Sequence, residues 1–120
     1  MAYQGPSGNT VEAYTAGYPP VVSLTSQSTV QAGAVLDGLA VRSAAVMSVT
    51  TSTGVSAGDV QLEGSLDGIN YFALGSAVST ATASTTTQLT VTSAFCRFVR
   101  ANITTAITGG TVTVSVGLNG

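Results

Sequence analysis

A period-two alternation of apolar and polar residues runs through most of this chain and limits what it can fold into. From Val21 onward, short runs with this pattern are separated by Gly, Asp and Asn. The clearest run is 60–66, in which every second residue is apolar or glycine. Such alternation places apolar side chains on one face of a strand. No segment beyond Pro20 has the 3.6-residue apolar spacing of an amphipathic helix, so the sequence predicts an all-β fold.

Eight short strands are predicted from these runs: 21–25, 29–31 with a continuation near Val35, 40–53, 60–66, 71–74, 88–92, 95–104 and 111–118. Short strands at this spacing are typical of a single antiparallel β-sandwich, of the jelly-roll or immunoglobulin-like kind. Gly109 and Gly110 permit the positive φ of a tight turn, which predicts that the last two strands form a hairpin with 105–110 in its loop.

The apolar members of the predicted strands form the predicted core. Alternation fixes which residues share a face but not always which face is buried. The predicted core residues are Val41, Met47, Val49, Val60, Leu62, Leu66, Phe72, Leu89, Val91, Val99, Ile103, Val112, Val114 and Val116.

The first twenty residues differ in composition from the rest. Residues 1–20 are rich in Gly and Pro, which oppose both helix and central strand, and they have no periodic apolar face. We therefore expect an extended N-terminal arm at 1–20 and one sandwich domain at 21–120, since 120 residues suffice for one core. Tyr3, Tyr14 and Tyr18 are rigid aromatics of the type that anchors interfaces, so we expect the arm to lie along a neighbouring subunit or partner. The alternative is a disordered tail.

The residue types that are missing argue against an enzyme. The chain has no histidine, lysine or tryptophan, and its positive charges are Arg42, Arg97 and Arg100. General bases near neutral pH and common nucleophile triads need an imidazole, and Schiff bases need lysine. No histidine or lysine is present to activate the thiol of Cys96. We expect no catalytic residues, no cofactor and no metal.

Sparse charge also limits the partners. Charged residues make up 7% of the chain and the net charge is −2, which disfavours nucleic acid. No stretch is apolar and long enough to predict a membrane span. Either much of the surface lies against neighbouring proteins, or Ser and Thr hydroxyls provide the solvation. Arg97 and Arg100 are three residues apart in one strand and are expected on opposite faces, one of them pairing with Glu63 or Asp59.

Two segments carry a family resemblance. Residues 62–71 read Leu-Glu-Gly-Ser-Leu-Asp-Gly-Ile-Asn-Tyr, and residues 97–104 read Arg-Phe-Val-Arg-Ala-Asn-Ile-Thr. They resemble an LEGSxDGxNW pattern followed by an RYVRAxxT strand, found in small β-sandwich proteins of tailed bacteriophage virions and, in looser form, in galactose-binding-like modules. Tyr71 stands where the pattern has tryptophan, and Phe98 where it has tyrosine.

The segment 67–71 allows more than one interpretation. Asp67 and Gly68 form a strong turn signal, and a turn-forming role is favoured over calcium binding by Asp67 and Asn70, because the carboxylates are too few for a calcium loop. Glu63 and Asp67 are about 13 Å apart at a rise of ~3.3 Å per residue, too far for paired glycosidase carboxylates. Asp67, Asn70 and Tyr71 are candidate interface residues, or sugar-binding residues if the chain is a carbohydrate-binding module.

The resemblance, the sparse charge and the arm together favour a virion structural protein of a tailed bacteriophage. The most favoured role is a capsid decoration or cement protein, made in the host cytoplasm and placed on the capsid surface. Its partners would be the major capsid protein and further copies of itself, as a closed homotrimer. The alternative is a carbohydrate-binding module or an accessory protein of the neck, tail or baseplate.

Overall fold

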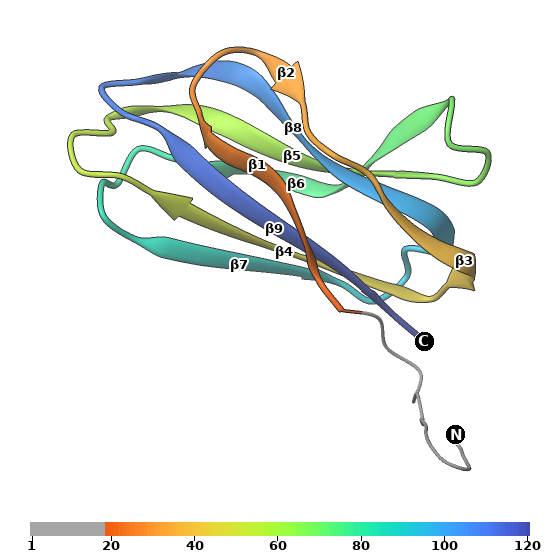
Figure 1. The fold of residues 1–120 in the computed structure, drawn as a ribbon. Helices are drawn as coiled ribbons and strands as arrows, with labels where there is room; N and C mark the ends of the chain where they lie inside the picture. The colour runs from red at the N-terminus through yellow and green to blue at the C-terminus, as the bar shows by residue number, and fades with distance from the viewer. Residues whose placement is uncertain (1–18) are drawn as a thin grey trace, which may run out of the picture.

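Residues 19–120 are described by the computed structural model, and in this range the chain forms two antiparallel β-sheets packed face to face (Figure 1). No helix occurs between residues 19 and 120, and thus none that could cross a membrane. The predicted β-sandwich is confirmed, with nine strands where about eight were expected. The strands are β1 (Val21–Gln27), β2 (Gln31–Ala32), β3 (Leu36–Arg42), β4 (Ala44–Thr51), β5 (Ala57–Ser65), β6 (Tyr71–Ser79), β7 (Thr86–Val91), β8 (Cys96–Thr108) and β9 (Val112–Asn119).

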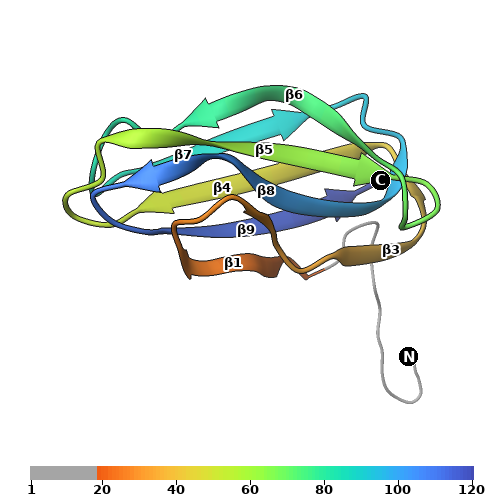
Figure 2. The same cartoon turned by 90° about the horizontal axis from the view of Figure 1, so that it is seen from above.

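The strand order is that of a jelly roll. The four-stranded sheet has the order β1-β9-β4-β7, and the five-stranded sheet has the order β2-β8-β5-β6 with β3 also paired to β8. Strands β2 and β3 pair with successive parts of β8 and act as two pieces of one interrupted strand. The first strand therefore pairs with the last, β2 and β3 with β8, β4 with β7, and β5 with β6 (Figure 2). Nested pairing of this kind makes two sheets with few exposed edges.

The core lies between the two sheets, where the inward residues of each strand meet. Met47 and Val49 of β4 lie opposite Val116 and Val114 of β9, and all four are at most 1% exposed. Nine of the predicted core residues are fully buried: Met47, Val49, Val60, Leu62, Val99, Ile103, Val112, Val114 and Val116. Leu89 and Val91 are partly buried against this core. Leu24 and Leu36 join it from segments for which no core residue was predicted, and Leu118 continues the alternation of Val112, Val114 and Val116.

Three core predictions are wrong: Val41, Leu66 and Phe72 are 55%, 60% and 43% exposed. Leu66 follows the last residue of β5, so the alternation of that strand no longer applies to it. Val41 lies in an irregular part of β3, where the register with β8 shifts. Phe72 lies on β6, which is the edge strand of its sheet, and pairs with Gly64 of β5. The edge position leaves the Phe72 side chain partly uncovered.

Two predictions of strand connection are also wrong. The segment 40–53, predicted as one strand, is divided at Ser43, because β3 belongs to the five-stranded sheet and β4 to the four-stranded sheet. The last two strands do not form a hairpin, since β8 and β9 lie in different sheets and residues 105–108 extend β8. The glycine pair at 109–110 instead turns the chain from one sheet to the other, with Gly109 at a φ of 86°.

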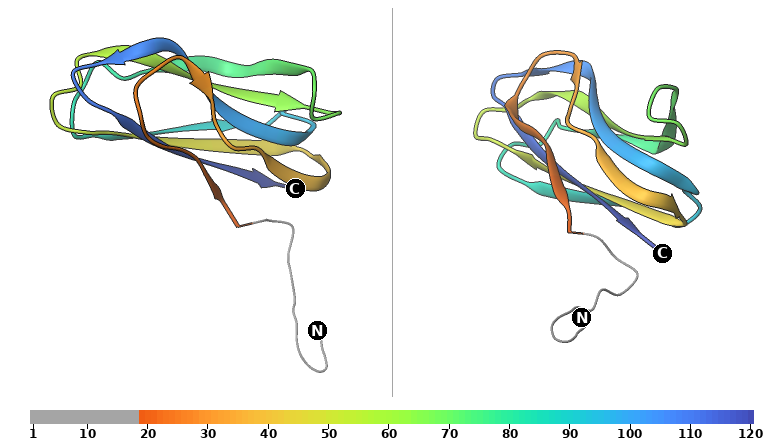
Figure 3. Two further views of the ribbon diagram at one scale, coloured as in Figure 1. Left: turned by 45° about the horizontal axis from the view of Figure 1, so that its top comes forward. Right: turned by 45° about the vertical axis from the view of Figure 1, so that its right-hand side comes forward.

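The arm predicted for residues 1–20 lies outside the described residues except for Pro19 and Pro20. Both prolines are exposed, and β1 begins directly after them at Val21. The described chain thus starts at the edge of the four-stranded sheet, where Val21 of β1 pairs with Val116 of β9 (Figure 3).

Candidate interaction surfaces

The turn between β5 and β6 is organised by the carboxylate of Asp67. Its Oδ1 accepts hydrogen bonds from the backbone N–H groups of Ile69 and Asn70, both at 2.8 Å, and from the hydroxyl of Ser65 at 2.9 Å. Its Oδ2 accepts one from the side-chain amide of Asn70 at 2.9 Å. These donors favour the charged form and hold the pKa of Asp67 well below its usual range. Both carboxylate oxygens are therefore engaged within the turn, as the turn-forming interpretation predicts.

A cluster of four side chains lies next to this turn on the outward side of the five-stranded sheet. Arg100 Nε donates to Glu63 Oε1 at 2.8 Å, and Asn102 Nδ2 donates to Glu63 Oε2 at 3.1 Å. The Arg100 guanidinium also lies 3.8 Å from the centroid of the Tyr71 ring, a cation–π contact. Burial raises the pKa of Tyr71. The predicted pairing of one arginine with Glu63 is confirmed, and one face of Tyr71 is covered by this arrangement.

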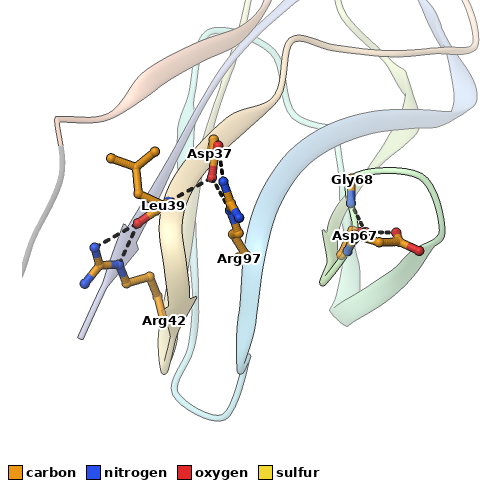
Figure 4. A network of polar contacts seen from close by, with 8 residues as sticks. Asp37, Leu39, Arg42, Asp67, Gly68 and Arg97 are labelled. Atoms are coloured by element: carbon orange, nitrogen blue, oxygen red, sulfur yellow. Dashed lines mark hydrogen bonds and ion pairs between the residues drawn. The ribbon is translucent and has the colours of Figure 1, made fainter.

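A second ion pair joins β3 to β8 (Figure 4). Arg97 donates from Nε and Nη2 to the two oxygens of Asp37 at 2.8 and 3.0 Å, and its guanidinium lies 4.9 Å from the Phe98 ring centroid. The hydrogen bonds from Arg97 and from the Leu39 N–H lower the pKa of Asp37. Each arginine of β8 thus has a carboxylate on a different neighbouring strand, and the two do not form a shared anion clamp.

The charged side chains are distributed very unequally between the two sheets. All of those in residues 19–120 lie in the five-stranded sheet or its β5–β6 turn: Asp37, Arg42, Asp59, Glu63, Asp67, Arg97 and Arg100. The strands of the four-stranded sheet, β1, β4, β7 and β9, contain no Asp, Glu, Lys, Arg or His. One side of the sandwich therefore meets its surroundings without any charge.

The outward side of the four-stranded sheet is a surface of hydroxyls, amides and small apolar groups, here named the uncharged face. In register, Ser48 lies between Gln88 and Ser115, and Thr50 lies between Thr86 and Thr113. The Thr50 and Thr86 hydroxyls are hydrogen-bonded at 3.0 Å. The uncharged face consists of Val22, Val46, Ser48, Thr50, Thr86, Gln88, Thr90, Thr113, Ser115 and Gly117.

A shallow depression lies on the uncharged face where the described chain begins. Its lining includes Pro20, Val46, Ser48, Gln88 and Gly117. A side chain at 117 would meet Val46, since a Cβ there would lie 3.0 Å from Val46 Cγ1, so the glycine helps to keep this area hollow. The segment 1–18 thus joins the sandwich at the edge of a hollow on its uncharged side.

Of the six predicted interface residues, Asp67, Asn70 and Tyr71 are brought together at the β5–β6 turn. The other three, Tyr3, Tyr14 and Tyr18, lie outside the described residues. Sequence reasoning missed the uncharged face, although its signal is present: the runs 21–27, 44–51, 86–91 and 112–119 are all free of charged residues. The lack of charge in these runs indicates a shared surface only once the structure shows that all four pair in one sheet.

The described residues provide no grouping of three or more His, Cys, Asp or Glu side chains suited to a metal ion. Cys96 is fully buried and its thiol is free, and burial raises its pKa. A thiol with a raised pKa is a poor nucleophile, so Cys96 acts as a core residue.

No protein-family model matches the chain, and no curated protein matches it. Among solved structures, the sandwich is similar to the crystal structure of the SPBc2 prophage-derived protein YomS, with a TM-score of 0.61. The alignment covers 92% of this chain and 100% of that one, at 13% sequence identity. At that identity the similarity shows a common fold: this chain has the same β-sandwich architecture as YomS.

Proposed function

We propose that this chain is a non-enzymatic virion structural protein of a tailed bacteriophage, and that it acts as a capsid decoration (cement) protein. The observation that carries the proposal is the uncharged face. The centres of protein interfaces are depleted of charged residues, whereas a sheet face exposed to water in a monomer usually carries them. A complete outer sheet face without charge suits a protein whose working state is an assembly.

Two further observations support a phage protein. The similar fold of YomS belongs to a prophage-derived protein. The residues that resemble the virion pattern are also the ones that build the β5–β6 turn and its flanking cluster, since Ser65, Asp67 and Asn70 form the turn while Glu63 and Arg100 pair beside it. The residues that match the virion pattern therefore form one structural unit, the β5–β6 turn with the ion pair beside it.

The proposed mechanism is adhesive. Uncharged and apolar surface would contact neighbouring major capsid protein subunits on the outside of the shell, and many weak contacts would add up through multivalency. A homotrimer fits the threefold positions of a shell and forms part of the proposal. Neither nucleic acid nor membrane is invoked, because each arginine of β8 already pairs with a carboxylate of this chain.

The carbohydrate-binding alternative has less support from the site. It relied on Asp67, Asn70 and Tyr71, but the Asp67 oxygens are engaged in the turn and one face of Tyr71 is covered by Arg100. A sugar at this turn would need an aromatic face and free polar groups. An accessory role at the neck, tail or baseplate is distinguished from the capsid role by the following experiment.

The test is to locate the protein on particles. Purified full-length protein would be added to isolated capsids and, separately, to isolated tails, and its position would be imaged by cryo-electron microscopy. We expect regular density on the outer capsid surface and native mass spectrometry consistent with a trimer. Density confined to the neck, tail or baseplate would reject the decoration role, and a monomer well above micromolar concentration would reject the trimer.

A further inference from the structure

Three places in residues 19–120 join an Asp or Asn to a following glycine. The pairs are 37–38 and 67–68, which are Asp-Gly, and 119–120, which is Asn-Gly. At such a pair the backbone nitrogen of the glycine can attack the side-chain carbonyl carbon before it, because glycine has no Cβ to obstruct the approach. The attack closes a five-membered succinimide ring, which water then opens. The structure distinguishes the three pairs by how it holds the first side chain.

The two Asp-Gly pairs lie in the same four-residue motif. Residues 36–39 read Leu-Asp-Gly-Leu and residues 66–69 read Leu-Asp-Gly-Ile. In both copies the aspartate Oδ1 accepts the backbone N–H two residues later, at 2.8 Å. Each carboxylate is therefore bound to the nitrogen beyond the glycine, whereas ring closure needs the nitrogen of the glycine itself.

Asp37 is also held by its ion pair. Arg97 donates from Nε and Nη2 to the two Asp37 oxygens at 2.8 and 3.0 Å (Figure 4). Residues 38–41 form a bulge opposite Arg97, because the register of β3 with β8 shifts there. A carboxylate kept in its charged form by an arginine is a poor electrophile, since its negative charge repels an attacking nitrogen. Asp37 is therefore protected from ring closure.

Asp67 is protected by the turn that it forms. The Ser65 hydroxyl and the Asn70 side-chain amide donate to its two oxygens, both at 2.9 Å. The N–H of Gly68, whose nitrogen would have to attack, donates to the Ser65 hydroxyl at 2.9 Å. Both reacting groups of this pair are thus bound elsewhere.

The Asn-Gly pair is arranged in the opposite way. The Gly120 N–H donates to Oδ1 of Asn119 at 2.8 Å, so the attacking nitrogen lies beside the carbonyl whose carbon it would attack. Among residues 19–120, no other group is hydrogen-bonded to the Asn119 side chain. Asn119 is exposed and is the last residue of β9. Its amide is also neutral, which makes it a better electrophile than either carboxylate.

Asn119 lies on the same side of β9 as the uncharged face. Thr113, Ser115 and Gly117 belong to that face, and the period of two continues to residue 119. Asn119 pairs with Ala44 at the start of β4. Because the strands of this sheet contain no charged side chain, a carboxylate at 119 would be the first in it.

We propose that Asn119 is a deamidation site, at which reaction with water places a negative charge beside the uncharged face. Hydroxide removes the Gly120 amide proton, and the nitrogen bonds to Cγ of Asn119. The side-chain nitrogen takes a proton from water and leaves as ammonia, which gives the succinimide. Water then adds to one of the two ring carbonyls and opens the ring to aspartate or isoaspartate. No oxidant or reductant is needed.

The first test is peptide mapping of full-length protein incubated in warm, mildly alkaline buffer. Cleavage after Arg100 releases the peptide 101–120, which carries Asn102 as an internal control. Asn102 donates to Glu63 and precedes a β-branched isoleucine, which obstructs ring closure. We expect Asn119 to deamidate about tenfold or more faster than Asn102, as read from the fragment masses. Equal rates at the two asparagines, or no conversion at Asn119, would overturn the inference.

The two aspartates are the structural control. Labelling with an isoaspartyl methyltransferase should detect isoaspartate at 119 in the folded chain and only background at Asp37 and Asp67. In urea, where the ion pair and the turn are lost, labelling at both aspartates should rise. Labelling of the folded chain at Asp37 or Asp67 as strong as at 119 would show that the hydrogen bonds do not protect them, and would contradict the selection argued from the structure.

Gly120→Ala is the variant that blocks the reaction at its attacking residue. A Cβ at 120 would meet the Ser43 hydroxyl, and residue 120 follows the last strand, so the sandwich itself should be retained. We expect deamidation at Asn119 to slow by about tenfold or more, because the added side chain obstructs ring closure. An unchanged rate would mean that ammonia is lost by direct hydrolysis, without the Gly120 nitrogen.

The effect of the new charge rests on the proposed function, whereas the chemistry does not. Asn119→Asp reproduces the charge without incubation. We expect it to bind isolated capsids about threefold or more weakly, since a charge at the rim of an interface costs less than one at its centre. Unchanged binding would reject the placement of Asn119 beside the capsid contact. If the unchanged chain fails to bind capsids, the proposed function fails while the mapping result stands.

Discussion

The two sheets of the sandwich cover the same core but are specified by different means. In the five-stranded sheet, Arg97–Asp37 and Arg100–Glu63 tie the central strand β8 to β3 and β5. In the four-stranded sheet, β4 is held to β9 and β7 by backbone ladders and by the Thr50–Thr86 hydroxyl pair. The difference teaches that four of the seven charged side chains in residues 19–120 pair strands within one sheet, and the strands of the other sheet carry none.

Register shifts occur in both sheets, since the edge pairing of β1 with β9 is shifted twice without any charge, but the central pairings of the two sheets differ. The pairing of β4 with β9 and with β7 runs without a shift, so the alternation of apolar residues is sufficient to fix it. The pairing of β8 with β3 and with β5 is interrupted by register shifts. A bulged ladder is less well specified by alternation alone, and a cross-strand ion pair selects one register among several.

The largest expected effect tests whether the uncharged face must stay uncharged. Ser48 lies in the middle of that face, and Ser48→Lys would place one positive charge in the proposed interface. Burying an unpaired charge costs several kcal/mol, so we expect capsid affinity to fall by about a hundredfold or more. Binding of labelled protein to capsids measures this, and chemical denaturation should show nearly unchanged stability because surface substitutions usually change it by less than about 0.5 kcal/mol.

The matched variant is Thr104→Lys, which adds the same charge at an exposed position on β8 in the five-stranded sheet. We expect its capsid affinity to stay within a few-fold of the unchanged chain. Equal losses for the two variants would mean that both sheets contact the capsid or that added charge acts at long range. If both variants keep full capsid affinity, the uncharged face is not the capsid contact, and the argument for the decoration role fails.

The next effect concerns the better buried ion pair. The Glu63 and Arg100 side chains are 16% and 26% exposed, against 37% and 41% for Asp37 and Arg97. Glu63→Ala leaves Arg100 and Asn102 without their shared acceptor, and we expect the free energy of unfolding to fall by about 1–3 kcal/mol. Urea denaturation measures this loss, with Glu63→Gln as a milder variant. A larger loss from Asp37→Ala would contradict the assignment of Glu63–Arg100 as the stronger pair.

Acid should destabilise the folded chain through two carboxylates of the five-stranded sheet and its β5–β6 turn. The pKa values of Asp37 and Asp67 are lowered in the folded chain, Asp37 first by Arg97 and Asp67 first by the Asn70 N–H. In the unfolded chain an aspartate titrates near ~3.9. Below about pH 4 the unfolded state therefore binds more protons, and stability is lost as the pH falls toward the lowered values.

We expect the thermal midpoint to decrease as the pH falls from about 4 to about 2. Above about pH 4, Asp37 and Asp67 should cause no change in the midpoint. Asp67→Asn keeps one acceptor oxygen but cannot titrate, so its midpoint should depend less on pH than that of the unchanged chain. An Asp67→Asn profile parallel to that of the unchanged chain would show that the turn carboxylate does not contribute to acid sensitivity.

The sandwich and most of its core could be predicted from the sequence, because alternation is a local signal. Val60 and Leu62, or Val112 and Val114, are buried as their period of two requires. The partner of each strand is a non-local property, and this is where prediction failed. Two glycines at 109–110 suit a hairpin, yet β8 extends to Thr108 and the chain crosses to the other sheet.

The candidate surfaces show the same division between local and non-local information. The Asp67 turn was predicted correctly, since an Asp-Gly pair after a strand is a local signal. The equivalent motif at 36–39 was missed, because Val41 was assigned to a continuous strand and to the core. Only the pairing with β8 reveals that residues 38–41 bulge outward against Arg97. The uncharged face needed the strand order, which joins segments up to about 95 residues apart.

The smallest expected effect asks whether the β3 bulge of the five-stranded sheet is held by its polar contacts or by the Leu39 side chain. Leu39→Gly removes an exposed side chain and relieves the unfavourable φ of 62°. Relief of left-handed strain is worth about 1–2 kcal/mol, and the greater freedom of glycine in the unfolded chain costs about 0.5–1 kcal/mol. We therefore expect the free energy of unfolding to change by less than about 1 kcal/mol, toward higher stability.

Ala40→Gly is the matched variant, since Ala40 lies next to Leu39 in the same bulge and is absent from the positive-φ residues. Here glycine brings only its entropic cost, so stability should fall by about 0.5–1 kcal/mol. Urea denaturation of the two variants side by side gives the difference directly. If Leu39→Gly is clearly the more damaging of the two, Leu39 packs against its own chain. The bulge would then be held by apolar contact, and the contrast between an ion-paired sheet and an uncharged one would be weaker at this strand.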